Sequence, residues 1–139
     1  MRYYAVIDTN VLVSAMLKIT SVPGQIAIKA LTGEIIPLLN DEILAEYNEV
    51  LHRPKFKLTQ DQITGLLEGI ISRGIFIDAG PVDEILPDPK DAVFYEVVME
   101  ARTKTDARLI TGNLKHFPVK SYIVTPREML DIIDGGVTR

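Results

Sequence analysis

The sequence predicts an α/β protein: a three-layer α/β/α sandwich with a mostly parallel central sheet of about five strands, in a single domain spanning residues 1–139. Short, almost entirely apolar segments, typical of strands buried on both faces, alternate with longer segments of helical periodicity. A length of 139 residues fits one domain with a substantial core. The apolar fraction of 47% and the charged fraction of 24% are those of a globular protein and argue against intrinsic disorder.

The N-terminal segment predicts one strand followed by two helices. Tyr3–Ile7 is almost entirely apolar, so we expect a strand that is buried on both faces. Thr9 or Asn10 can cap a helix that runs to about Leu17. Ser21 followed closely by a proline is typical of the start of a second helix.

A second strand and two amphipathic helices are expected next. Ile35–Leu39 is the strand, Asn40 or Asp41 opens the first helix, Pro54 ends it, and Thr59–Ser72 forms the second helix. Apolar residues recur every three or four positions in both helices: Ile43, Leu44, Tyr47, Val50 and Leu51 in the first, and Ile63, Leu66, Leu67 and Ile70 in the second.

The middle of the chain predicts a strand, a loop and another helix. Gly74 precedes the strand Ile75–Asp78, and Gly80–Pro89 contains three prolines and should form a loop. Asp88-Pro89-Lys90-Asp91 then begins a helix that continues to about residue 101. Its inward-facing positions are Val93, Phe94, Val97, Val98 and Ala101.

The C-terminal part predicts two short strands and a final helix. Arg108–Thr111 and Tyr122–Val124 are the strands, and the loop Gly112–Pro118 separates them. The start of the last helix has the arrangement of a capping box, with Thr125, Pro126 and Glu128. Gly135 and Gly136 end that helix.

Composition excludes several classes of site. The absence of cysteine excludes disulfides, zinc–thiolate sites and cysteine nucleophiles, and it fits a reducing cytoplasm. The first apolar run is too short for a signal peptide, and no segment approaches the roughly 20 apolar residues of a membrane helix. We therefore expect a soluble cytoplasmic protein. The net charge of −4 argues against a protein that binds nucleic acid by charge alone. It argues less against a metallonuclease, because clustered carboxylates contribute negative charge until a divalent cation neutralises them.

Two acidic residues are expected at one edge of the predicted sheet, where open parallel sheets bind ligands beyond the carboxyl ends of their strands. Asp8 follows directly on the first strand. Glu46 lies at the margin of the apolar stripe of its helix, whereas Glu42 and Glu49 point further toward water. A cap or turn role for Asp8 and a solvent-boundary role for Glu46 are the alternatives.

Asp88 and Asp91 begin a helix, and helix capping explains both of them fully. Two carboxylates at such a place also suit a hard cation. If the strand ending at Thr111 lies beside the first strand, Thr111 and Asn113 come close to Asp8. Asn113 then offers a neutral carbonyl ligand or an orienting amide, and an ordinary Gly-Asn turn is the alternative.

Several carboxylates that meet at one edge cannot be packed there unpaired, because repulsion and desolvation would raise their pKa values. The sequence offers no obvious buried Lys or Arg to match them, so a divalent cation is the simplest partner. Oxygen ligands, no cysteine and only two histidines favour Mg²⁺ or Mn²⁺ over zinc.

Four segments resemble the PIN-domain family, in order and over essentially the whole chain. Residues 6–15, Val-Ile-Asp-Thr-Asn-Val-Leu-Val-Ser-Ala, are similar to the opening PIN motif. Residues 42–51, followed by Arg-Pro-Lys-Phe at 53–56, are similar to a VapC-like subgroup of toxins from toxin–antitoxin pairs. Residues 88–91 and 109–117 resemble the third and fourth motifs.

The resemblance implies a Mg²⁺- or Mn²⁺-dependent ribonuclease that hydrolyses RNA phosphodiester bonds. Asp8 and Asp91 match metal ligands of the family, and Glu46 matches an acid that binds metal or positions the attacking water. Asn113 stands where many PIN domains have aspartate, which removes one charge from the site. Asn10, Asp88 and Thr111 would support these catalytic residues.

The resemblance also implies partners. A toxin of this kind acts on RNA and is silenced by a small antitoxin protein, and a homodimer is a further expectation. Five basic residues are candidate phosphate contacts, with a solvated surface side chain as the alternative for each: Lys55, Lys57, Arg102, Lys104 and Lys115.

Two other functions remain open at this point. Asn113 also fits a PIN fold that binds RNA or protein but cleaves weakly or not at all. A receiver-like phosphoacceptor domain has acids at strand ends too, but it would normally place an acidic pair after the first strand, where this chain has only Asp8.

Overall fold

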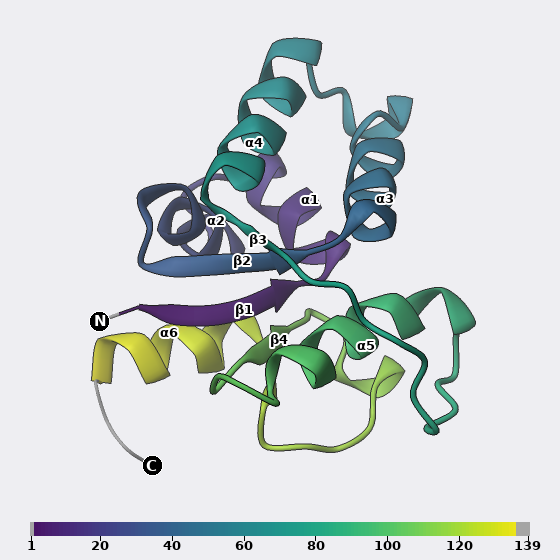
Figure 1. The fold of residues 1–139 in the computed structure, drawn as a ribbon. Coiled ribbons are helices and arrows are strands. Elements are labelled where there is room, and N and C mark those ends of the chain that lie inside the picture. The colour runs from purple at the N-terminus through teal and green to yellow at the C-terminus, as the bar shows by residue number, and fades with distance from the viewer. Residues whose placement is uncertain (1, 136–139) are drawn as a thin grey trace.

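The computed structural model describes residues 2–135 and consists of one five-stranded, all-parallel sheet with helices on both faces (Figure 1). The strands are β1 (Tyr3–Ile7), β2 (Ile35–Leu39), β3 (Ile75–Phe76), β4 (Arg108–Ile110) and β5 (Ile123–Val124). The α-helices are α1 (Thr9–Leu17), α2 (Val22–Thr32), α3 (Asp41–Leu51), α4 (Gln60–Arg73), α5 (Ala92–Ala101) and α6 (Pro126–Gly135). Three single-turn 3₁₀ helices are η1 (Pro54–Phe56), η2 (Pro89–Asp91) and η3 (Leu114–His116). The predicted α/β fold class is confirmed.

The order of the strands, β3-β2-β1-β4-β5, brings β1 and β4, which are about 100 residues apart in the chain, side by side at the centre of the sheet. The chain steps outward from β1 to β2 and β3, returns through α5, and adds β4 against the free side of β1. Ile7 pairs with Ile110, so β1 and β4 end side by side. The loops that follow these two strands therefore meet at the carboxyl edge of the sheet.

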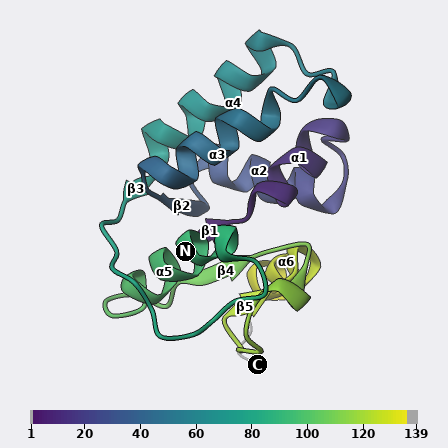
Figure 2. The same cartoon turned by 90° about the vertical axis from the view of Figure 1, so that its right-hand side faces the viewer.

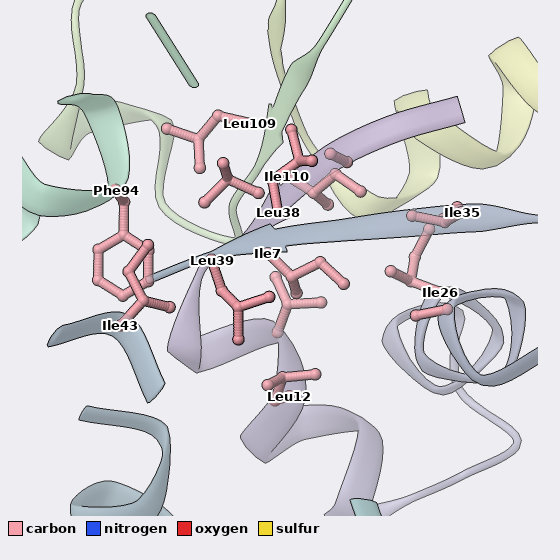
Figure 3. Close-up of a cluster of buried hydrophobic side chains, with 14 of the residues drawn as sticks. Ile7, Leu12, Ile26, Ile35, Leu38, Leu39, Ile43, Phe94, Leu109 and Ile110 are labelled. Carbon is pink, nitrogen blue, oxygen red and sulfur yellow. The ribbon is translucent and has the colours of Figure 1, made fainter. Parts of the chain in front are cut away.

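Helices cover the sheet on both faces (Figure 2). α5 lies on one face, α1, α2 and α6 lie on the other, and the α3–α4 hairpin stands beside α1 and α2. Apolar side chains of the strands pack against apolar side chains of both helical layers (Figure 3). They include Ile7, Ile35 and Leu109 from the strands and Leu12, Ile26 and Phe94 from the helices. This double cover explains why β1 is almost entirely apolar.

The helix caps differ in part from the predicted ones. Asn40 caps α3 by accepting a hydrogen bond from the backbone N–H of Ile43, as expected. In α1, however, the N-cap position is occupied by Asp8 rather than by Thr9 or Asn10, because the helix already begins at Thr9, and no side chain caps this helix end. α3 ends at Leu51, and the proline expected to end it instead begins η1.

Several element boundaries also differ. β3 has two residues instead of the four predicted, because it is an edge strand with a partner on one side only and both its side chains are exposed. β4 stops at Ile110, one residue before the predicted end, and β5 begins at Ile123. The expected capping box of α6, between Thr125 and Glu128, is present. Gly136, expected to end that helix, lies outside the described residues.

Within residues 2–135, no single helix is long and apolar enough to cross a membrane. α1 and α2 reach the length and apolar composition of a membrane span only when they are taken together, and the chain bends by 104° between them.

Candidate metal and active site

Asp8 lies at the carboxyl end of β1, beside β4 and the start of α1. We call Asp8 together with Glu46, Asp91 and Thr111 the acidic pocket. Asp8 is only 5% exposed to solvent. Its Oδ2 accepts hydrogen bonds from Thr111 Oγ1 at 2.8 Å and from Asn10 Nδ2 at 3.3 Å. Although Asp8 occupies the N-cap position of α1, its side chain makes no capping hydrogen bond. Capping therefore does not account for this carboxylate.

The environment of Asp8 disfavours its negative charge. The pKa of Asp8 is raised to about 6, because burial and the negative charges of Asp91 and Glu46 outweigh the hydrogen bond from Thr111, which lowers it. The two other acids predicted for the site thus lie close enough to act on Asp8.

Glu46 reaches this pocket from α3. Thr9 Oγ1 donates a hydrogen bond to Glu46 Oε2, which ties α3 to the first turn of α1. The neighbouring Tyr47, which is fully buried, donates its hydroxyl hydrogen to the backbone carbonyl of Ile7. Two adjacent residues of α3 therefore fix that helix against the end of β1.

Asp91 is the last residue of η2 and immediately precedes α5. The two acids of this segment have different roles. Asp88 caps the turn by accepting a hydrogen bond from the backbone N–H of Lys90 at 3.0 Å, whereas Asp91 makes no capping hydrogen bond. Asp91 Oδ2 is buried and has no hydrogen-bond donor, although His116 Nδ1 lies 3.1 Å away. Burial raises the pKa of Asp91, and the nearby His116 opposes that increase.

The loop after β4 completes the pocket. Thr111 is fully buried, and its Oγ1 accepts a hydrogen bond from the backbone N–H of Asn113 at 3.0 Å while donating to Asp8. The side-chain amide nitrogen of Asn113 lies 2.9 Å from His116 Nε2. The Gly112 N–H donates to Asn10 Oδ1 at 3.1 Å, and a Cβ on this glycine would lie 3.2 Å from the same oxygen. Asn10 and Thr111 thus hold the loop against Asp8.

The sequence of this chain matches the model of the PIN domain over residues 4–115. The chain belongs to the PIN-domain family. Members of this family are typically metal-dependent nucleases, so the acidic pocket lies in a fold that generally uses divalent metals. Membership in the PIN-domain family also excludes the receiver-like phosphoacceptor domain as an alternative. No curated protein and no solved structure gives a significant match.

The side chains present in this PIN domain fit a divalent cation. Asp91 has a buried oxygen without a donor, and neither Asp8 nor Glu46 forms an ion pair with Lys or Arg among residues 2–135. Within the same residues, no three His, Asp or Glu side chains converge on one position, and the carboxylates of Glu46 and Asp8 accept hydrogen bonds from the hydroxyls of Thr9 and Thr111. Mg²⁺ needs only one or two carboxylates besides water, so the donor set suits it.

The candidate phosphate contacts of the PIN domain are spread over distant surfaces. Lys115 lies in η3, next to the pocket. Lys55 and Lys57 lie in and just after η1, beyond the end of α3. Arg102 is not brought to the pocket: its Nη1 donates to the carbonyl of Ala107, at the amino end of β4, and its guanidinium stacks on an aromatic ring. Lys104 follows Arg102 at that opposite edge of the sheet.

Two residues of the pocket were missed as site residues by sequence reasoning. Thr9 was expected only to cap α1, and His116, in the loop Gly112–Pro118, was considered for proton transfer but interpreted as a loop residue. The contacts of Thr9 with Glu46 and of His116 with Asp91 join segments that are far apart in the chain, and no local pattern predicts them.

Proposed function

We propose that this PIN domain is a Mg²⁺-dependent ribonuclease that hydrolyses RNA phosphodiester bonds. The main support is the grouping of Asp8, Glu46 and Asp91 at one edge of the sheet without a balancing Lys or Arg ion pair among residues 2–135. A buried carboxylate such as Asp8, whose pKa is raised by burial and by neighbouring negative charges, is stabilised by a cation.

A bound divalent cation lowers the pKa of a coordinated water and neutralises charge on the phosphate. Asp8 and Asp91 are the residues that would hold the ion. Thr111 and Asn10 orient Asp8 through its Oδ2. Thr9 orients Glu46, which is then placed to bind the ion as well or to position the attacking water.

Cleavage of a labelled single-stranded RNA in the presence of Mg²⁺ or Mn²⁺ tests the proposal. Asp8→Asn and Asp91→Asn should reduce cleavage to the level of wild type in EDTA, and Glu46→Gln should reduce it about 10²-fold or more. Asp61→Asn, an exposed change on α4, and Glu68→Gln on the same helix serve as matched controls and should retain full activity. Equal cleavage by wild type and Asp8→Asn would rule out the assigned site.

We propose further that the protein is a cytoplasmic toxin whose ribonuclease activity is silenced by a small antitoxin protein. Support comes from the similarity of residues 42–51 and 53–56 to toxins of the VapC-like subgroup. Induced expression should arrest growth, and co-expression of a short neighbouring reading frame should relieve the arrest. Arrest by the Asp8→Asn variant as well would separate toxicity from RNA cleavage. Size-exclusion chromatography with light scattering tests the expected homodimer.

A second candidate is a PIN domain that binds RNA or protein and cleaves weakly or not at all. Two observations favour it: Asn113 is neutral, and residues 2–135 contain no ready three-ligand group. Asn113→Asp discriminates between the two functions. A large gain in cleavage identifies a degenerate site, whereas unchanged cleavage shows that the asparagine is already competent.

A further inference from the structure

Both ring nitrogens of His116 contact residues of the candidate site. Its Nδ1 lies 3.1 Å from Asp91 Oδ2, and its Nε2 lies 2.9 Å from the amide nitrogen of Asn113. We propose that His116 is a direct nitrogen ligand of the metal site, so that this chain binds Mn²⁺ in preference to Mg²⁺. This inference rests on the proposed metal site.

The distance between His116 and Asp91 is the first argument. Two neighbouring ligands of an octahedral ion, with bonds of about 2.1 Å at right angles, lie about 3 Å apart. The separation of Nδ1 and Oδ2 is 3.1 Å, and no other group donates to the buried Oδ2. Both atoms therefore already stand at the spacing of adjacent ligands of one ion.

The contact with Asn113 is the second argument. A histidine that binds a metal through one ring nitrogen usually donates the N–H of the other to an oxygen, which fixes the ring. Nε2 of His116 lies against the side-chain amide of Asn113, and a half-turn of that amide presents its oxygen instead of its nitrogen. The backbone of Asn113 is held in turn by Thr111 Oγ1, which also binds Asp8.

These contacts form one continuous chain from Asp8 through Thr111, Asn113 and His116 to Asp91. The two predicted metal ligands are thus linked through the single loop after β4. Asparagine at position 113 has a role in this arrangement, because it supports the imidazole instead of supplying a fourth carboxylate.

The chemistry of the ligand sets the expected preference. Imidazole nitrogen suits transition metals, whereas carboxylate, carbonyl and water oxygens suit Mg²⁺. Loss of His116 should therefore reduce the affinity for Mn²⁺ much more than the affinity for Mg²⁺.

The test measures metal binding to the full chain without RNA. Titration calorimetry gives the dissociation constants for Mn²⁺ and Mg²⁺, and pulsed electron paramagnetic resonance detects ¹⁴N coupling to bound Mn²⁺. Wild type should show histidine ¹⁴N coupling. His116→Ala should lose this coupling and bind Mn²⁺ at least about 10-fold more weakly, with a change of less than about 3-fold for Mg²⁺.

The second histidine of the chain supplies the matched control. His52 is exposed at the end of α3, where it contacts Asn48 and Gln60, so His52→Ala should retain both the coupling and the affinity. If thermal melting shows that His116→Ala does not fold, His116→Gln is compared with wild type instead.

The outcomes separate this inference from the proposed function. Two results would overturn the inference. One is binding of Mn²⁺ by wild type without ¹⁴N coupling, and the other is an equal loss of affinity for Mn²⁺ and Mg²⁺ in His116→Ala. Histidine coupling in a protein that leaves RNA intact would support the inference and contradict the ribonuclease. Failure of the wild type to bind either metal would overturn both.

Discussion

At the scale of single residues, Asp8 combines a buried position with a charge that the metal-free fold does not balance. Hydrogen bonds from Thr111 and Asn10 offset part of the cost of burying it, but its pKa still rises to about 6. A site that is unfavourable without its ligand is common where binding or catalysis requires a buried charge.

The raised pKa predicts the pH dependence of stability in the metal-free protein. Between about pH 4 and pH 6 the folded state binds a proton at Asp8 that the unfolded state has already released, so the free energy of unfolding falls as pH rises through this range. Asp8→Asn removes this dependence. The free energy of unfolding of Asp8→Asn should exceed that of wild type by almost nothing at pH 4 and by at most about 3 kcal/mol above pH 7.

Urea unfolding in EDTA at a series of pH values measures this difference. Asp61→Asn, with its exposed carboxyl, should follow the wild-type curve. A difference between Asp8→Asn and wild type that does not vary with pH would contradict the raised pKa.

Most acidic residues of the site could be found from the sequence because their positions follow from local rules. Asp8 ends an apolar strand, and Glu46 has the phase of a helix margin. Thr9 and His116 could not be found in this way, because their partners lie 37 and 25 residues away in the chain. Family resemblance assigned roles that the local patterns left open at Asp91, where capping was an equally complete explanation.

At the scale of elements, prediction worked best where burial follows a regular period. The four apolar residues predicted for α4, Ile63, Leu66, Leu67 and Ile70, are the buried residues of that helix. Prediction failed where pairing decides the length of an element. β3 is short because it lies at the edge of the sheet, and the strand order that puts it there is a property of the whole chain.

Substitution by alanine at two helical glycines should change the stability of the protein in opposite directions. In α2, a Cβ on Gly24 would lie 2.0 Å from the backbone oxygen of Ile19, so Gly24→Ala must displace the α1–α2 loop and should destabilise the protein by about 1–3 kcal/mol. In α4, nothing lies within 4 Å of the corresponding position on Gly65, so Gly65→Ala should stabilise by about 0.5–1 kcal/mol. Chemical denaturation measures both changes, and changes of the same sign would contradict the packing around Gly24.

At the scale of the whole molecule, a ligand that joins α3, α5 and the loop after β4 should stabilise the fold. Mg²⁺ or Mn²⁺ binds the folded state in preference to the unfolded chain, and at 100 times the Kd this adds about 2.7 kcal/mol. The Tm of wild type should therefore rise with metal concentration. Asp8→Asn and Asp91→Asn should show no such rise, and NaCl at equal ionic strength controls for screening. A rise of the same size in these variants would place the bound metal elsewhere.

The parallel topology also sets when the pocket is completed during synthesis. Thr111 and Asn113, beside Asp8, and His116, which contacts Asp91, belong to a strand end and loop that are made more than 100 residues after Asp8. At roughly 5–20 residues per second, a ribosome needs about 5 to 20 s to cover that stretch. On the proposed function, a nascent chain is harmless to the messenger that encodes it until the loop after β4 has been made. A stalled chain that ends before Arg108 should cleave no RNA.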